Sequence, residues 1–355
     1  MKKSKKHKIG MAPGSLVYTG EMTTQKPTLS LIDYCENHLN EKIIKIEDLA
    51  SIKPDTNNKI WLNLSGIHDL NLIREIGKNF NLHPLVLEDI LNTDQRPKLE
   101  SYGEYLYVVL RNFELKRTGN LFSRQVSLIL GKHFVLTFEE QITECFEPVY
   151  ERLRNGRVQI RQADTDYLAY ALIDVIVDQY FSIIEDIGIH CETLEEKLLR
   201  KPSPGLLQKI QILKRESMEL RRGVWPTREV INNLIRNDEG FFEPSTVPYL
   251  RDIYDHAVHV IESLEAVRDL LAGMLDIYLS TISNQLNKEV RALTVVTMMF
   301  MPATLISGIF GMNFDNMPLL KDKFGFWIAI GMMTLIAIVM GLHFFRMQWL
   351  SRRGI

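Results

Sequence analysis

The chain has 355 residues and a formal net charge of −2, and its mean hydropathy of −0.06 is typical of a water-soluble protein. That average combines a long polar part with a very apolar part that begins near Ala292. The three cysteines are scattered without CxxC spacing, which fits reduced thiols in a cytoplasm and argues against a structural zinc site.

Residues 1–14 are basic and are expected to be flexible, and no apolar stretch follows them, so they do not form a secretory signal peptide. Residues 15–160 alternate strand-like and helical patterns, with helices predicted at about 68–80 and 83–92. Runs rich in β-branched and aromatic residues predict strands at 42–46, 59–64, 105–111, 126–130 and 133–138. A Gly-Lys pair before the last run indicates a hairpin turn. This pattern favours an α/β or α+β domain, which we expect to lie in the cytoplasm.

Residues 161–246 have a helical pattern, and a first helix ends near Arg200, where prolines follow. A second helix runs to about Arg222, after which Pro226 interrupts or kinks the chain. Residues 247–312 form the longest predicted helix, roughly 95–100 Å at 1.5 Å per residue. A helix of that length cannot bury itself against one small domain. We therefore expect a stalk that continues into a membrane without a break.

Neither residues 292–312 nor residues 324–342 contain Asp, Glu, Lys, Arg or His, and each run is close to the ~20 residues that cross a bilayer core. One such run is compatible with a buried helix of a soluble protein. Two in succession predict two membrane spans, about 292–312 and 324–345, joined by a short external loop at 313–323. The remaining residues, 346–355, form a tail.

Basic residues near the spans predict the orientation of the chain in the membrane. The loop contains Lys321 and Lys323, which weaken the charge asymmetry. Basic residues on the other side of the spans are more numerous: Lys288, Arg291, Arg346, Arg352 and Arg353. The positive-inside rule therefore favours a multi-pass protein of the cell membrane with both termini in the cytoplasm.

Two spans cannot enclose a water-filled path, so a channel would need several copies of the chain around one axis. A helix that lines such an axis is expected to carry a polar stripe with a period of about 3.5 residues. Leu293 lies beside such a stripe, which steps through Asn287, Val290, Thr294, Thr297, Met301, Thr304, Gly308 and Gly311. The alternative is that the threonines bond their own backbone and the small residues serve helix packing.

Gly311, Met312 and Asn313 stand at the outer end of the first predicted span. A hard dication such as Mg²⁺ gives up its bound waters reluctantly, so a filter for it need not remove them. Carboxamide and carbonyl oxygens accept hydrogen bonds from those waters, and glycines let the backbone approach the axis. The position of this short motif predicts a selectivity filter for a hydrated dication.

Five segments resemble the CorA family of magnesium/cobalt transporters, the two-helix metal-ion channels with a Gly-Met-Asn motif: 83–91, 95–98, 125–130, 249–256 and 300–314. The resemblance extends from about residue 15 to Leu350. It implies a homopentameric cytoplasmic funnel in which the first membrane helix lines the pore. It also implies that Leu293 and Met301 form an apolar constriction. The chain departs from the family at Leu319, where a glutamate is usual, so outer-mouth cation attraction is expected to be weaker.

The same resemblance implies two regulatory metal sites in the cytoplasm. In the first, Mg²⁺ lies between Asp89 of one subunit and Asp252 of its neighbour. In the second, nearby, the ligands are Glu88, Asp174 and His256. Without the resemblance, the simpler interpretation is that these candidate ligands belong to a solvated acidic helix face. We expect the other acidic residues of the 164–200 helix, Asp178 among them, to form a solvated face as well.

The stripe and the motif predict an influx channel for Mg²⁺, and also for Co²⁺ or Ni²⁺. The resemblance further implies that bound Mg²⁺ closes this channel from the cytoplasm. The membrane potential supplies roughly 4.6 kcal/mol per 100 mV for a dication, and no GxxxxGK[S/T] nucleotide loop occurs. One alternative is a Zn²⁺ transporter of the same superfamily, although the stripe has no His or Cys ligand for such a metal. Proton coupling would need an ionisable group within the spans, and His343, at the end of the second span, is the only one. Another alternative is a membrane-anchored enzyme or scaffold. We expect no enzyme activity, no organic cofactor, and no nucleotide or nucleic-acid partner.

Overall fold

The computed structural model describes residues 10–20, 24–52, 58–115, 121–156, 158–200, 202–236, 238–313, 317–319 and 322–346. Most of the predicted basic N-terminus lies outside these residues, as do Lys321, Arg352, Arg353 and almost all of the predicted tail. The chain divides into two compact units. The first contains Met1–Glu196 and Gly205–Gly273, and the second contains Lys197–Pro204 and Met274–Ile355.

The first unit contains one mixed sheet of seven strands within the described residues, in the order β2-β1-β3-β7-β6-β5-β4. Neighbouring strands run antiparallel except β3 and β7, which pair in parallel with Leu62 opposite Leu136. The strands are β1 (Thr28–Cys35), β2 (His38–Ile43), β3 (Lys59–Ser65), β4 (Lys98–Ser101), β5 (Tyr105–Leu115), β6 (Leu121–Gly131) and β7 (Phe134–Glu139).

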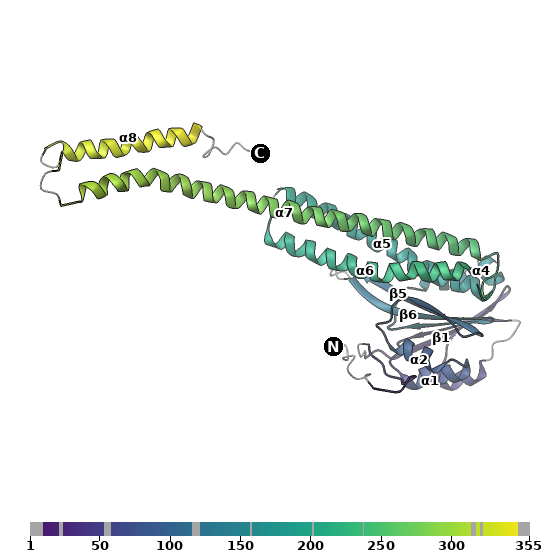
Figure 1. Ribbon diagram of the computed structural model, residues 1–355. Coiled ribbons are helices and arrows are strands. Elements are labelled where there is room, and N and C mark those ends of the chain that lie inside the picture. The colour runs from purple at the N-terminus through teal and green to yellow at the C-terminus, as the bar shows by residue number, and fades with distance from the viewer. Residues whose placement is uncertain are drawn as a thin grey trace. The chain divides into compact units, whose positions relative to one another are not determined.

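Helices cover both faces of this sheet (Figure 1). On one face, α1 (Leu70–Asn79) and α2 (Pro84–Leu91) bury Ile73 and Ile90 in an apolar core with β-strand residues such as Leu62 and Leu136. A short 3₁₀ helix, η2 (Ile46–Ser51), joins this core through Leu49. The start of α2 is determined locally, because the His83 side chain accepts a hydrogen bond from Leu85 N and Pro84 occupies the first turn.

Long helices lie over the other face, together with α3 (Glu147–Arg154) and α4 (Val158–Gln162). They are α5 (Thr165–Arg200), α6 (Pro204–Arg236) and the first part of α7 (Val247–Phe310). The Tyr180 hydroxyl on α5 donates a hydrogen bond to the Arg111 carbonyl on β5 at 2.6 Å. Gly223 lets α6 approach the same strand, since a Cβ there would lie 2.5 Å from the Phe113 ring.

Four of the five predicted strands and both predicted helices of residues 15–160 are confirmed, as is the β6–β7 hairpin. The strand predicted at 42–46 is misplaced, because β2 ends at Ile43 and η2 begins at Ile46. The prediction that α6 ends near Arg222 is wrong, since α6 continues through Pro226 to Arg236. Buried residues beyond the proline, such as Ile231, hold the helix together and offset the ~3 kcal/mol that an internal proline costs.

A buried carboxylate lies between the sheet and α3. Glu139 Oε1 accepts hydrogen bonds from Asn63 Nδ2 and Ser65 Oγ, both at 2.8 Å, and Thr143 donates to Oε2 at 2.5 Å. Burial raises the pKa of Glu139, and these hydrogen bonds offset only part of that effect. The folded state therefore holds the Glu139 proton more tightly than the unfolded chain does.

We expect Glu139→Gln to stabilise the protein by about 1 kcal/mol above neutral pH, because it removes the cost of ionising a buried group. The wild-type penalty is absent at pH below the ordinary glutamate range, grows as pH rises through that range, and levels off above the raised pKa. The glutamine amide can donate to the Thr143 hydroxyl, so the geometry is kept. Thermal unfolding of the detergent-solubilised protein between pH 4 and 8 measures this. A variant whose melting temperature falls with pH as steeply as that of the wild type would contradict it.

The second unit contains the C-terminal part of α7 and α8 (Gly325–Arg346), which lie side by side (Figure 1). Three described helices are long and apolar enough to cross a membrane: α5, α7 and α8. The apolar window of α5 is 72% buried inside the protein, whereas those of α7 and α8 are 6% and 11% buried. Burial therefore identifies α5 as a core helix and leaves α7 and α8 as the two predicted spans.

Gly325 closes the turn that leads into α8. A Cβ at this position would lie 1.9 Å from the Leu319 carbonyl oxygen, and Leu319 itself has a positive φ of 70°. We expect Gly325→Ala to destabilise the protein by about 3 kcal/mol, because the added methyl group overpacks the turn. Gly331→Ala is the matched control, since no atom lies within 4 Å of its Cβ. Equal melting temperatures for the two detergent-solubilised variants would contradict this account of the turn.

Candidate ion path and metal sites

One face of the apolar part of α7 packs on α8. Val295 on this face is 2% exposed, and a Cβ on Gly341 of α8 would lie 3.9 Å from Met299. The residues that follow at helical spacing are partly buried: Pro302, Ala303, Ile306 and Phe310. The chain therefore uses the apolar and small residues of this face to hold its two candidate spans together.

The predicted polar stripe lies on the opposite face of α7. At about 100° per residue, Thr297, Thr304 and Gly308 point away from the Val295–Phe310 face. The stripe residues from Asn287 to Gly311 are exposed, except Thr294, which is half-buried. Leu293, beside the stripe, is 67% exposed. A polar and small-residue stripe that its own chain leaves uncovered is available to line an axis between copies.

The three threonines of the stripe donate hydrogen bonds to their own helix. Thr294 Oγ1 bonds the Val290 carbonyl at 2.8 Å, and Thr297 and Thr304 bond the carbonyls four residues earlier at 2.9 Å. This is the backbone bonding that the packing alternative predicts. It consumes the hydroxyl proton and leaves oxygen lone pairs, which accept hydrogen bonds from water around a cation.

The Gly-Met-Asn motif begins where α7 ends. Gly311 N donates to the Ser307 carbonyl at 2.9 Å and Met312 N to the Ile309 carbonyl at 3.2 Å, which completes the last turn after Phe310. A Cβ added at Gly311 would lie 3.2 Å from the Ser307 carbonyl oxygen, so a side chain here would be in tight contact with the preceding turn of α7. The exposed Asn313 follows Met312, just beyond the C-terminal end of α7.

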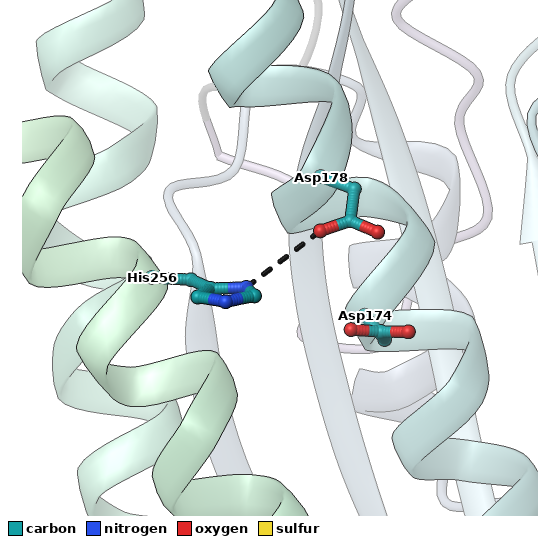
Figure 2. A group of neighbouring side chains, drawn as sticks. All are labelled: Asp174, Asp178 and His256. Atoms are coloured by element: carbon teal, nitrogen blue, oxygen red, sulfur yellow. Dashed lines mark ion pairs between the residues drawn. The ribbon is translucent and has the colours of Figure 1, made fainter.

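A second cluster, in the first unit, combines two carboxylates of α5 with a histidine of α7. Asp174, Asp178 and His256 each offer one ligand atom, a carboxylate oxygen or an imidazole nitrogen, and these three atoms lie within 4.8 Å of one another (Figure 2). His256 Nδ1 is 3.7 Å from Asp178 Oδ1, and among the described residues this buried nitrogen has no hydrogen-bond partner. Two oxygens and one imidazole nitrogen form a ligand set that suits a divalent metal ion.

The electrostatics of this cluster also favour a cation. Burial raises the pKa of Asp174, and the neighbouring Asp178 raises it further, while Arg152 and His256 act in the opposite direction. Arg152 Nη1 lies 3.4 Å from Asp174 Oδ2 and supplies only part of the compensating charge. A bound dication would remove the remaining repulsion between the carboxylates.

The predicted partners Asp252 and Asp89 lie outside this cluster. Asp252 is 67% exposed, with its Oδ2 3.9 Å from His256 Nε2. On α2, Asp89 pairs with Lys98 at 2.6 Å, and Glu88 Oε2 accepts a hydrogen bond from Gly14 N at 2.7 Å. Within one chain, Asp174 and His256 therefore meet Asp178 rather than Glu88. The pairing of α2 with α7 across two subunits stays a prediction.

Comparison with known proteins identifies the family. The family described as CorA-like Mg²⁺ transporter protein matches residues 57–346. The chain belongs to this family. It is 42% identical over 346 residues to the cobalt/magnesium transport protein CorA of Thermotoga maritima, covering 97% of this chain and 98% of that protein. It is 31% identical to the putative metal ion transporter YfjQ of Bacillus subtilis, covering 82% of this chain and 90% of that protein.

The fold of this CorA-family chain is shared with a solved relative. The complete structure of the CorA magnesium transporter from Methanocaldococcus jannaschii matches with a TM-score of 0.77 at 19% identity, covering 94% of this chain and 99% of that one. The predicted mixed α/β domain, long helices and two apolar C-terminal helices are thus confirmed. Because CorA proteins are transporters, the prediction that the chain is not an enzyme is also confirmed.

Proposed function

We propose that this CorA-family chain forms a homopentameric Mg²⁺ channel in the cell membrane, with both termini in the cytoplasm. The membrane potential drives Mg²⁺ inward, and Co²⁺ and Ni²⁺ follow the same path. The single observation that carries the proposal is the uncovered stripe of α7, which runs from Asn287 to Gly311 on the face opposite α8 and leads to Asn313. Five copies of this stripe around an axis enclose a path that one chain cannot form.

The chemistry of the stripe suits a hydrated dication. Asn313 carboxamides at the outer end accept hydrogen bonds from the waters of Mg²⁺ without the tight hold of a carboxylate ring, so the ion can leave. Thr297 and Thr304 present hydroxyl oxygens further along the path. Exposed Leu293 and Met301 narrow it with apolar side chains, which close a pore by excluding water.

The cytoplasmic carboxylates close this channel when Mg²⁺ is abundant. Asp89 and Asp252 of neighbouring subunits hold one ion, and Asp174 and His256, with Glu88, hold a second. Asp178 joins this second site, because its carboxylate lies beside His256. Bound dications remove repulsion between subunits and stabilise the closed pentamer, so loss of the ions opens the pore through reciprocal linkage.

Ion flux into proteoliposomes tests the proposal. Purified protein, an inside-negative potential and an internal Mg²⁺ dye are expected to give Mg²⁺ entry without a proton gradient. Cobalt hexaammine, a mimic of hydrated Mg²⁺, is expected to block it. Zn²⁺ entry that requires a proton gradient, with no Mg²⁺ entry, would instead support the alternative of a zinc transporter and contradict the proposal.

A further inference from the structure

Asp89 on α2 has both carboxylate oxygens engaged by its own chain. Gln95 Nε2 donates to Oδ1, and Lys98 Nζ donates to Oδ2 at 2.6 Å. The Asp89 backbone carbonyl also accepts a hydrogen bond from Gln125 Nε2 at 2.9 Å. The side chain of Asp89 is 20% exposed, so an ion that approaches its carboxylate meets these two donors.

Lys98 is shared between two carboxylates. Its ammonium lies 2.6 Å from Asp89 Oδ2 and 2.6 Å from Glu100 Oε1. Glu100 is held in turn by the Tyr102 hydroxyl, 3.1 Å from its other oxygen. Burial alone would lower the pKa of Lys98, but the hydrogen bonds and the negative charges of Asp89 and Glu100 together outweigh that effect and raise the pKa. The lysine therefore stays charged at physiological pH and has a second partner when it leaves Asp89.

We propose that Lys98 is a tethered cation that competes with Mg²⁺ for Asp89 and so sets the Mg²⁺ concentration at which the channel closes. This inference rests on the proposed regulatory role of Asp89. An ammonium and a dication at one carboxylate repel each other, so binding of Mg²⁺ requires the ammonium to shift toward Glu100. The lysine lowers the affinity of the site and keeps it empty at low Mg²⁺.

The test removes the charge of Lys98 and keeps its length. Lys98→Met preserves the apolar stem, which lies near the Tyr107 ring. For the full-length protein in detergent, we expect the Mg²⁺ concentration that gives half-maximal protection from chymotrypsin to fall about tenfold. Chymotrypsin is chosen because it does not cleave after lysine. An unchanged or higher midpoint would overturn the inference.

Two further variants separate charge from structure. Lys98→Arg keeps the charge and is expected to keep a midpoint close to that of the wild type, so a fall equal to that of Lys98→Met would contradict a charge effect. Lys78→Met removes a lysine paired with Glu75 at 2.6 Å elsewhere in the same unit and is expected to leave the midpoint unchanged. If the midpoint also falls in Lys78→Met, the effect comes from the net charge of the protein rather than from Lys98, and the inference is overturned.

Glu100→Gln tests the second partner of the lysine. As a single substitution, it is expected to raise the midpoint Mg²⁺ concentration, because the lysine then stays on Asp89. Added to Lys98→Met, it is expected to change that concentration less. Equal effects in both backgrounds would contradict a shift of the lysine between the two carboxylates.

Asp89→Asn keeps this inference distinguishable from the proposed function. If Asp89→Asn leaves the Mg²⁺ dependence unchanged, the regulatory role of Asp89 fails, and the inference fails with it. If Asp89→Asn weakens the Mg²⁺ effect and Lys98→Met does not strengthen it, only the role of Lys98 is wrong.

Discussion

Asn313→Ala is expected to reduce potential-driven Mg²⁺ entry into proteoliposomes on the order of 100-fold or more. The reason is that each carboxamide in the proposed ring contributes about 1 kcal/mol of hydrogen bonding to the hydrated ion, and all are lost together. Asn313 is exposed and lies just beyond the C-terminal end of α7, directly after Gly311 and Met312. Initial rates measured with an internal Mg²⁺ dye give the comparison.

Asn284→Ala provides the matched control for that experiment. It makes the same change at an exposed asparagine of α7 that lies outside the stripe. We expect wild-type rates from this variant. Wild-type rates from Asn313→Ala would remove Asn313 from the filter, and an equal loss in both variants would show that the effect is not specific to the motif.

Asp89→Asn combined with Asp252→Asn is expected to raise the Mg²⁺ concentration needed for protease protection by more than about tenfold. Both changes keep the size of the side chain and remove the charge that a dication would neutralise between neighbouring subunits. The protein should therefore be cleaved by chymotrypsin at Mg²⁺ concentrations that protect the wild type. Its pore should also stay open at those concentrations, which the proteoliposome flux measures.

Asp269→Asn is the control for this double variant. Asp269 lies on the same helix, α7, is 72% exposed and pairs with Arg268 at 2.9 Å. Removal of its charge is expected to leave the midpoint unchanged. A wild-type Mg²⁺ dependence of the double variant would show that Asp89 and Asp252 do not sense the ion.

The elements of the second unit are readily predicted from the sequence. Residues 247–312 contain only three glycines and two prolines, which favours one long helix, and their last part, 292–312, lacks charge, as a membrane span does. The structure agrees, since α7 spans Val247–Phe310. The 3.5-residue period also identified the face of α7 that α8 does not cover. Periodicity cannot identify the face that packs on α8, because apolar residues suit lipid and protein equally.

The first unit shows where sequence patterns are insufficient. The sequence patterns do not predict β1, although Leu29 and Leu31 alternate with partly buried positions. They do not predict β4 either, because it is a four-residue edge strand with little apolar content. The sequence favours a solvated face for Asp178, because its four-residue spacing from Asp174 shows only that the two residues share one side of α5. Its relation to His256 depends on how α5 and α7 pack, which spacing along one helix does not specify.

Cysteine substitution on the two faces of α7 tests the central claim most directly, in a background where Cys35, Cys145 and Cys191 are replaced by alanine. Thr304→Cys places a thiol on the uncovered stripe, and Ile306→Cys places one on the face that packs on α8. With a positively charged, water-soluble thiol reagent, we predict that Mg²⁺ flux through Thr304→Cys is blocked and that flux through Ile306→Cys persists. Block at position 306 with continued flux at position 304 would contradict the assignment of the stripe as the ion path.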